Sequence, residues 1–111
     1  MIDINIIKCL TDNYSYLIAD KEKKFVAIID PSEFEPVDKI IRESYNKLDF
    51  ILNTHHHADH IGGNSKLKEK YNAKIICSYY DKDKIPNYDL LKKNGDEFNI
   101  GNLNFKVIHT P

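Results

Sequence analysis

Four of the five histidines in this chain lie within six consecutive positions: His55, His56, His57 and His60. Asp59 stands among them, and the pair Gly62-Gly63 follows. Imidazole nitrogens and carboxylate oxygens are the donors that zinc and iron take in hydrolytic sites. The cluster comes directly after residues 49–53, a short apolar run that predicts a buried strand. The chain is therefore expected to fold so that a metal-binding loop lies at the end of a buried strand.

The spacing inside the cluster indicates two metal ions. In extended backbone just past a strand, alternate side chains face the same way. His55 and His57 are therefore predicted to converge on one metal, while His56 points elsewhere. A turn then begins, so Asp59 and His60 can face a second metal beside the first. The alternative is a polar loop that is merely rich in histidine, but loops that follow buried strands are favoured active-site positions.

The rest of the chain predicts a mixed α/β fold. Helices are expected after Pro36, which suits a first turn, and from Gly62-Gly63 onward, with Asn64 or Ser65 as the capping residue. Residues 79–93 are polar and predict no element. A chain in which strands and helices alternate in this way is expected to form sheets covered by helices. Strands are predicted at residues 2–6, 14–19, 25–29, 49–53 and 73–78, and a hairpin at 97–100 and 103–108.

Charge and composition exclude several functions. The formal net charge is −1 and Arg42 is the only arginine, so no basic surface for nucleic acid or anionic membrane is expected. The sequence contains no run of about 18 apolar residues, so it predicts no transmembrane helix. The first residues alternate like a strand rather than a signal peptide. Cys9 and Cys77 lie in apolar runs and predict buried thiols, and a cytoplasmic location is expected.

Residues 54–60, T-H-H-H-A-D-H, resemble the T-H-x-H-x-D-H signature of the metallo-β-lactamase superfamily. The resemblance implies an α/β fold, the N-terminal half of the αββα sandwich of that superfamily, with a mixed sheet and flanking helices. It also implies that His55 and His57 bind the first metal, and that Asp59 and His60 bind the second. His56 fills the variable position of the signature.

The resemblance extends to glyoxalase II, the hydroxyacylglutathione hydrolase family. Residues 10–18, L-T-D-N-Y-S-Y-L-I, look like the opening strand pair of that family, and residues 27–31, A-I-I-D-P, look like the strand and turn that follow. This implies hydrolysis of a glutathione thioester, S-D-lactoylglutathione, to glutathione and D-lactate by a metal-activated water. Two divalent ions are implied, zinc above all, with iron and manganese also compatible. Asp59 would hold the second metal and orient the water.

Two departures keep alternatives open. Ala58 stands where glyoxalase II often has a bulky aromatic residue, and alanine there also resembles the persulfide dioxygenases, which use one iron. The third histidine of the first metal lies in a T-P-x-H context in the family, which here falls two residues beyond Pro111. His109 precedes Thr110-Pro111 and is not expected to be a ligand.

Residues 1–111 are therefore expected to be the N-terminal part of a catalytic domain. The remainder of that domain and the family's C-terminal helical substrate domain are absent from this sequence. A non-catalytic fragment that binds metal weakly is a further alternative, and such a fragment is expected to self-associate through an exposed sheet edge.

Asp30 has two interpretations. It ends a strand before proline, as a turn residue does. It also stands where a carboxylate can accept a hydrogen bond from the free N–H of a ligand histidine. Thr54 is expected to bond the loop backbone.

Overall fold

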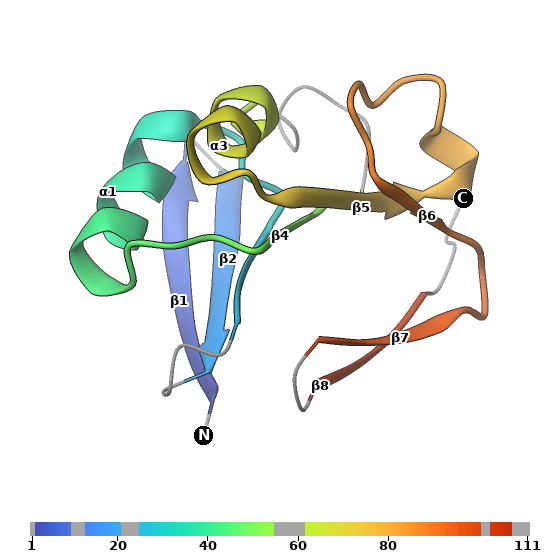
Figure 1. The fold of residues 1–111 in the computed structure, drawn as a ribbon, viewed down its shortest axis with the longest axis horizontal. Coiled ribbons are helices and arrows are strands. Elements are labelled where there is room, and N and C mark those ends of the chain that lie inside the picture. The colour runs from blue at the N-terminus through green and yellow to red at the C-terminus, as the bar shows by residue number, and fades with distance from the viewer. Residues whose placement is uncertain (1, 10–12, 21–24, 55–61, 101–102, 108–111) are drawn as a thin grey trace.

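A computed structural model of the chain describes residues 2–9, 13–20, 25–54, 62–100 and 103–107 (Figure 1). Six strands form one sheet in the order β1-β2-β3-β4-β5-β6, and β7 and β8 form a separate two-stranded sheet. The strands are β1 (Ile2–Cys9), β2 (Asn13–Asp20), β3 (Val26–Ile29), β4 (Phe50–Leu52), β5 (Lys74–Ser78), β6 (Leu90–Lys92), β7 (Glu97–Ile100) and β8 (Leu103–Lys106). The helices are α1 (Phe34–Ser44), α3 (Asn64–Tyr71) and the 3-10 turn η1 (Tyr79–Asp81).

The large sheet is antiparallel at one side and parallel at the other. β1, β2 and β3 pair antiparallel, whereas β3, β4, β5 and β6 pair parallel. Parallel neighbours require a crossover connection; α1 lies in the connection from β3 to β4, and α3 in that from β4 to β5. The carboxyl ends of the four parallel strands therefore meet at one edge of the sheet.

Both faces of the central strands are apolar, as the continuous runs in the sequence predict. One cluster of buried residues joins α1 and α3 to the sheet through Val37, Ile41, Leu67 and Ile28. A second cluster on the other face joins the sheet to the β7–β8 hairpin, with Ile100 packed near Leu52 and Ile76. In Figure 1 the two helices lie together, away from the hairpin. The predicted mixed α/β architecture is confirmed.

The first strand is apolar on both faces, but only one is covered. Ile7 and Cys9 are buried, whereas Ile4 and Ile6 are 64% and 66% exposed. Ile6 pairs with Tyr16, which is also exposed. Ile4 and Ile6 share a face, and it is the face that no helix covers. β1 is also an edge strand of the six-stranded sheet. Self-association of the fragment through such an edge stays a prediction.

The two cysteines are free and buried, as predicted. Burial, together with the nearby charge of Asp81, raises the pKa of Cys77 to about 11. Cys77 is therefore an unreactive thiol at neutral pH. None of the helices in the described part of the chain is long and apolar enough to span a membrane.

A charged cluster joins the two helices. The side chain of Asp38 in α1 is 5% exposed. Its carboxylate accepts hydrogen bonds from Arg42 Nε at 3.0 Å, from Lys70 Nζ at 2.8 and 2.9 Å, and from the Tyr71 hydroxyl. Burial raises the pKa of Asp38, but the hydrogen bonds and charge of Lys70 and the hydroxyl of Tyr71 outweigh burial and hold this pKa below its ordinary value. Asp38 thus fixes the C-terminal turn of α3 against α1.

We predict that Asp38→Ala lowers the free energy of unfolding by about 1–3 kcal/mol, less than for a fully buried pair because Lys70 and Arg42 are partly exposed. Because the folded pKa lies below 3.8, this stabilisation is complete above about pH 4 and is lost as the pH falls through the folded pKa. Urea denaturation should therefore show a gap between the two proteins at pH 7 that narrows near pH 3. Exposed Glu43→Ala is the control, and equal stability of Asp38→Ala and the parent at pH 7 would contradict the assignment.

Candidate metal centre

The expected metal ligands His55, His57, Asp59 and His60 lie outside the described residues. The structure does describe the chain on both sides of segment 55–61, with Asn53 and Thr54 before it and Gly62, Gly63 and Asn64 after it. This segment connects the carboxyl end of β4 to the amino end of α3. Ligands of parallel sheets bind beyond the carboxyl ends of the strands. The described residues therefore show what anchors the two ends of the segment that carries the expected ligands.

Asp30 joins the ends of two parallel strands. It follows β3, its backbone N–H donates to the carbonyl of Leu52 at 2.9 Å, and its side chain is 7% exposed. Its carboxylate accepts from the Thr54 backbone N–H at 2.7 Å and from the Thr54 hydroxyl. Asp30 is thus a strand-end turn residue, which was the first interpretation. Its carboxylate also binds Thr54, the residue that precedes His55. Whether a ligand histidine also donates to Asp30 stays a prediction.

The backbone of Asp30 has a φ of 51°, in the left-handed region. Non-glycine residues adopt this region at a cost, and aspartate tolerates it better than most. The hydroxyl of Ser15, fully buried on β2, donates to the Asp30 carbonyl at 2.7 Å. The backbone N–H of Ser32 donates to the same hydroxyl at 3.4 Å. Ser15 thereby supports the turn that aims the Asp30 carboxylate at Thr54.

The sequence interpretation missed Ser15, although a signal was present. Ser15 occupies an inward position of β2, two residues before the buried Leu17. A buried hydroxyl needs a hydrogen-bond partner. A serine at a core position of a strand therefore indicates that a polar group of a neighbouring segment is buried next to it.

Asn53 and Asn64 pair with each other across segment 55–61. Asn53 Nδ2 donates to Asn64 Oδ1 at 3.2 Å, and Asn64 Nδ2 donates to Asn53 Oδ1 at 2.6 Å. Both side chains are buried, with 7% and 2% exposed. The prediction that Asn64 or Ser65 caps the helix is wrong: the N-cap of α3 is Gly63, which has no side chain with which to cap it. The amide of Asn64 is directed at Asn53 instead.

Gly63 brings the start of α3 against the turn that follows β3. Its backbone N–H donates to the carbonyl of Pro31 at 2.7 Å. A Cβ atom on Gly63 would lie 3.1 Å from both the Pro31 oxygen and the Glu33 carbonyl carbon. Both contacts are backbone atoms, so nothing flexible can move aside. Glycine is therefore favoured here, because a side chain would force the backbone of Pro31 or Glu33 to shift.

The donor set of the segment fits divalent metal ions. His55, His57 and His60 offer imidazole nitrogens, and Asp59 offers carboxylate oxygens, the ligands that zinc and related metals take. Among the residues that the structure describes, no group of three or more histidine, cysteine, aspartate or glutamate side chains gathers to hold a metal. Segment 55–61 stays the predicted metal-binding segment.

Cationic side chains lie at the same edge of the sheet. Tyr79 directly follows β5, and Lys93 directly follows the neighbouring β6. The ammonium groups of Lys82 and Lys93 lie 4.4 and 4.6 Å from the centre of the Tyr79 ring. The hydrogen bond from Lys82 and the charges of both lysines lower the pKa of Tyr79. Two ammonium groups thus lie at this edge, with the carboxylate of Asp83 close enough to act on the same tyrosine.

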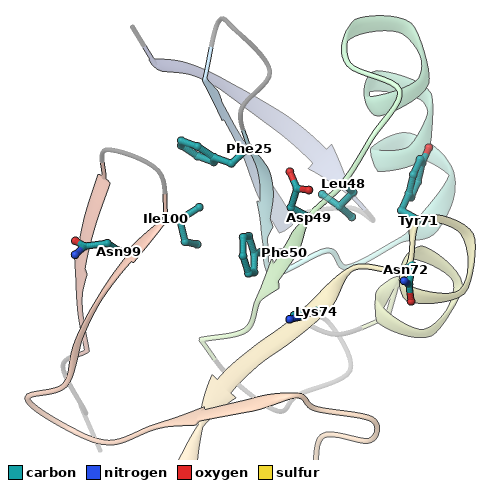
Figure 2. Close-up of a pocket in the computed structure, with 9 residues that line it drawn as sticks. All are labelled: Phe25, Leu48, Asp49, Phe50, Tyr71, Asn72, Lys74, Asn99 and Ile100. Atoms are coloured by element: carbon teal, nitrogen blue, oxygen red, sulfur yellow. The ribbon is translucent and has the colours of Figure 1, made fainter.

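Figure 2 shows a hollow of about 420 Å³ at the opposite end of the parallel strands. Phe50 and Lys74, the first residues of β4 and β5, line it together with Phe25, Asn72 and Ile100. Its lining is thus drawn from the amino ends of the strands, whereas Asp30 and Thr54 follow their carboxyl ends. This hollow is not part of the candidate metal centre.

Comparison with known proteins identifies the family. Residues 10–111 match the model of the metallo-beta-lactamase superfamily. The chain is 50% identical over 109 residues to a hydroxyacylglutathione hydrolase of Pelagibacter ubique, covering 98% of this chain and 46% of that protein. It is 42% identical over 110 residues to a hydroxyacylglutathione hydrolase of Brucella ovis, covering 99% of this chain and 43% of that protein. The chain thus spans less than half the length of these relatives.

Solved structures show the same fold. The BLEG-1 B3 metallo-beta-lactamase superposes with a TM-score of 0.83 at 21% identity, covering 100% of this chain and 62% of that one. ETHE1 from Myxococcus xanthus superposes with a TM-score of 0.76 at 27% identity, covering 94% and 46%. The chain belongs to the metallo-β-lactamase superfamily. Residues 10–18 and 54–60 indicate a resemblance to hydroxyacylglutathione hydrolases. The two relatives with that name confirm this resemblance.

We predict that Gly63→Ala lowers the free energy of unfolding by about 1–3 kcal/mol, because the added methyl group overpacks against the backbone of Pro31 and Glu33. Chemical denaturation of the purified variants measures the effect. Lys66→Ala, at an exposed position of the same helix, is the control for helix propensity. An unchanged denaturation midpoint in Gly63→Ala would show that α3 does not approach this turn as described.

Proposed function

We propose that the protein carrying this chain is a metal-dependent thioester hydrolase that converts S-D-lactoylglutathione to glutathione and D-lactate. The observation that carries the proposal is 50% identity, over 98% of the chain, to a protein named hydroxyacylglutathione hydrolase. The metallo-β-lactamase fold supports it, and so does the donor set of segment 55–61.

In this proposal His55 and His57 hold one divalent ion, and Asp59 and His60 hold the other. Zinc suits these ligands, and iron and manganese are compatible with them. Divalent ions bound there supply Lewis acidity, which lowers the pKa of water and favours negative charge on a carbonyl oxygen. Residues 1–111 form the N-terminal part of the catalytic domain in this proposal, and the protein acts in the cytoplasm.

Other residues of the chain hold the segment that carries the ligands, orient the water and attract the substrate. Asp30 and Thr54 hold the end of β4, so that the backbone enters segment 55–61 from a fixed point. Asp59 orients the attacking water. Lys82 and Lys93 attract a substrate that carries carboxylates. No side-chain nucleophile is needed, and the departing thiol, with a pKa near 8.5, needs little help from an acid.

A second candidate is a persulfide dioxygenase of the same fold. Ala58 favours it, because alanine at this position resembles those enzymes. It differs from the hydrolase in using one iron and consuming oxygen. A third candidate is a non-catalytic piece that is no enzyme and only binds metal weakly.

We predict that the full-length protein carries about two metal ions per chain and hydrolyses S-D-lactoylglutathione. Chelation should abolish the hydrolysis, and added zinc should restore it. Residues 1–111 produced alone should bind metal weakly and hydrolyse nothing. Metal content by elemental analysis and thiol release in a spectrophotometric assay measure both properties.

The alternatives give different results in the same assays. One iron per chain, oxygen uptake with a persulfide and no thioester hydrolysis would replace the hydrolase with the dioxygenase. A full-length protein without bound metal, inactive on both substrates, would contradict both enzymes.

A further inference from the structure

We propose that the Asn53–Asn64 amide pair is a positioning device for the metal centre: it fixes the two ends of segment 55–61 relative to each other, so that the ligands in that segment bind metal tightly. This inference rests on the proposed metal-dependent function and assigns it two residues that are not ligands. Asn53 precedes the first expected ligand by two residues, and Asn64 follows the last by four.

The pair connects the sheet to the helix. Asn53 directly follows β4, and its backbone N–H donates to the carbonyl of Ile76 in β5 at 3.0 Å. Asn64 is the first residue of α3. The two amides exchange hydrogen bonds of 3.2 and 2.6 Å. A rigid point on the sheet is thereby joined to the start of the helix, directly across the segment that carries the ligands.

Only a pair of primary amides makes this contact without charge. Each side chain donates through its NH₂ group and accepts through its oxygen, so the two bonds satisfy both residues reciprocally. Aspartate at either position would only accept and would place a charge where 7% or less of the side chain is exposed. An aliphatic residue would fill the space without fixing a direction. The chemistry of the contact therefore favours orientation over simple packing.

Helix formation does not explain the pair. Asparagine near a helix start commonly caps the free N–H groups with its side chain. Asn64 instead follows the N-cap residue, Gly63, and its side chain bonds to Asn53. The far end of α3 is fixed separately, by the contact of Lys70 and Tyr71 with Asp38. Gly63 joins the amino end of α3 to the turn after β3 through Pro31, and the amide pair joins it directly to the residue that follows β4, next to segment 55–61.

The test measures metal affinity in the full-length protein. Zn²⁺ binding is followed by competition with a chromogenic chelator, and Co²⁺ binding by its visible absorption. We predict that Asn53→Ala and Asn64→Ala each weaken metal binding about tenfold or more, as loss of a group that orients ligands does. Because each variant removes the same contact, the double variant should lose less than the product of the two single effects.

A second double variant separates positioning from folding. In Asn53→Leu/Asn64→Leu both polar groups are replaced by apolar groups of similar size, so the stability of the metal-free protein should return close to that of the parent. Metal affinity should stay reduced, because the directional bonds are gone. A double leucine variant that regains both stability and metal affinity would overturn the proposal, since packing alone would then be sufficient.

Two controls accompany these variants. Asp38→Asn weakens the opposite end of α3 and should lower stability while changing metal affinity less than threefold. Asn99 and Asn104 form a similar amide bond of 3.0 Å across the exposed β7–β8 hairpin, and alanine at both positions should leave metal binding unchanged. Equal losses of affinity in Asp38→Asn and Asn64→Ala would refute a local role.

Metal affinity also keeps this inference distinct from the proposed reaction. A full-length parent that binds metal tightly but leaves S-D-lactoylglutathione intact would refute the hydrolase. The amide pair would still be supported if Asn53→Ala and Asn64→Ala weakened the binding, and contradicted if they did not.

Discussion

The carboxylate of Asp30 is the contact on which the candidate centre depends. Three separate parts of the chain meet at this residue: Ser15 of β2 donates to the Asp30 backbone carbonyl, the end of β3 supplies Asp30 itself, and Thr54 at the end of β4 donates to the carboxylate. Parallel pairing of β3 with β4 makes this meeting possible, because it brings both carboxyl ends to the same edge. The following residue, Pro31, then accepts from Gly63. One turn after β3 thus anchors both the entry to segment 55–61 and the start of α3.

The backbone of Asp30 shows how tightly this turn is specified. Four non-glycine residues in the described part of the chain have positive φ: Asp30, Asn46, Asn72 and Asn87. The three asparagines are exposed or half-buried, at the ends of helices or in turns, where water solvates the backbone. Asp30 alone is buried, so its conformation persists through the contacts around it. Strain at a buried turn beside an expected metal centre agrees with a conformation selected for function.

The sequence predicted most of the fold, because its signals are local. Apolar runs located the central strands, and Pro36 and the pair Gly62-Gly63 located α1 and α3. The polar stretch 79–93 predicted nothing, yet it contains η1 and β6. β6 forms because Leu91 pairs with Cys77 of β5, a tertiary contact that no local pattern shows. The expected ligands came from a specific motif, whereas their supports did not: Ser15 and Asn64 act through partners distant in sequence, and Asn64 was interpreted as a cap.

Helix α3 is held at its two ends by different chemistry, and the difference suits a metal centre. Its C-terminal turn is held by charges, with Lys70 donating to the buried carboxylate of Asp38. Its amino end, beside segment 55–61, is held by the uncharged pair of Asn53 and Asn64. A carboxylate clamp at that end would offer divalent ions an additional strong ligand and would compete with the intended ones. Neutral amides supply directional contacts at the start of α3 without that competition.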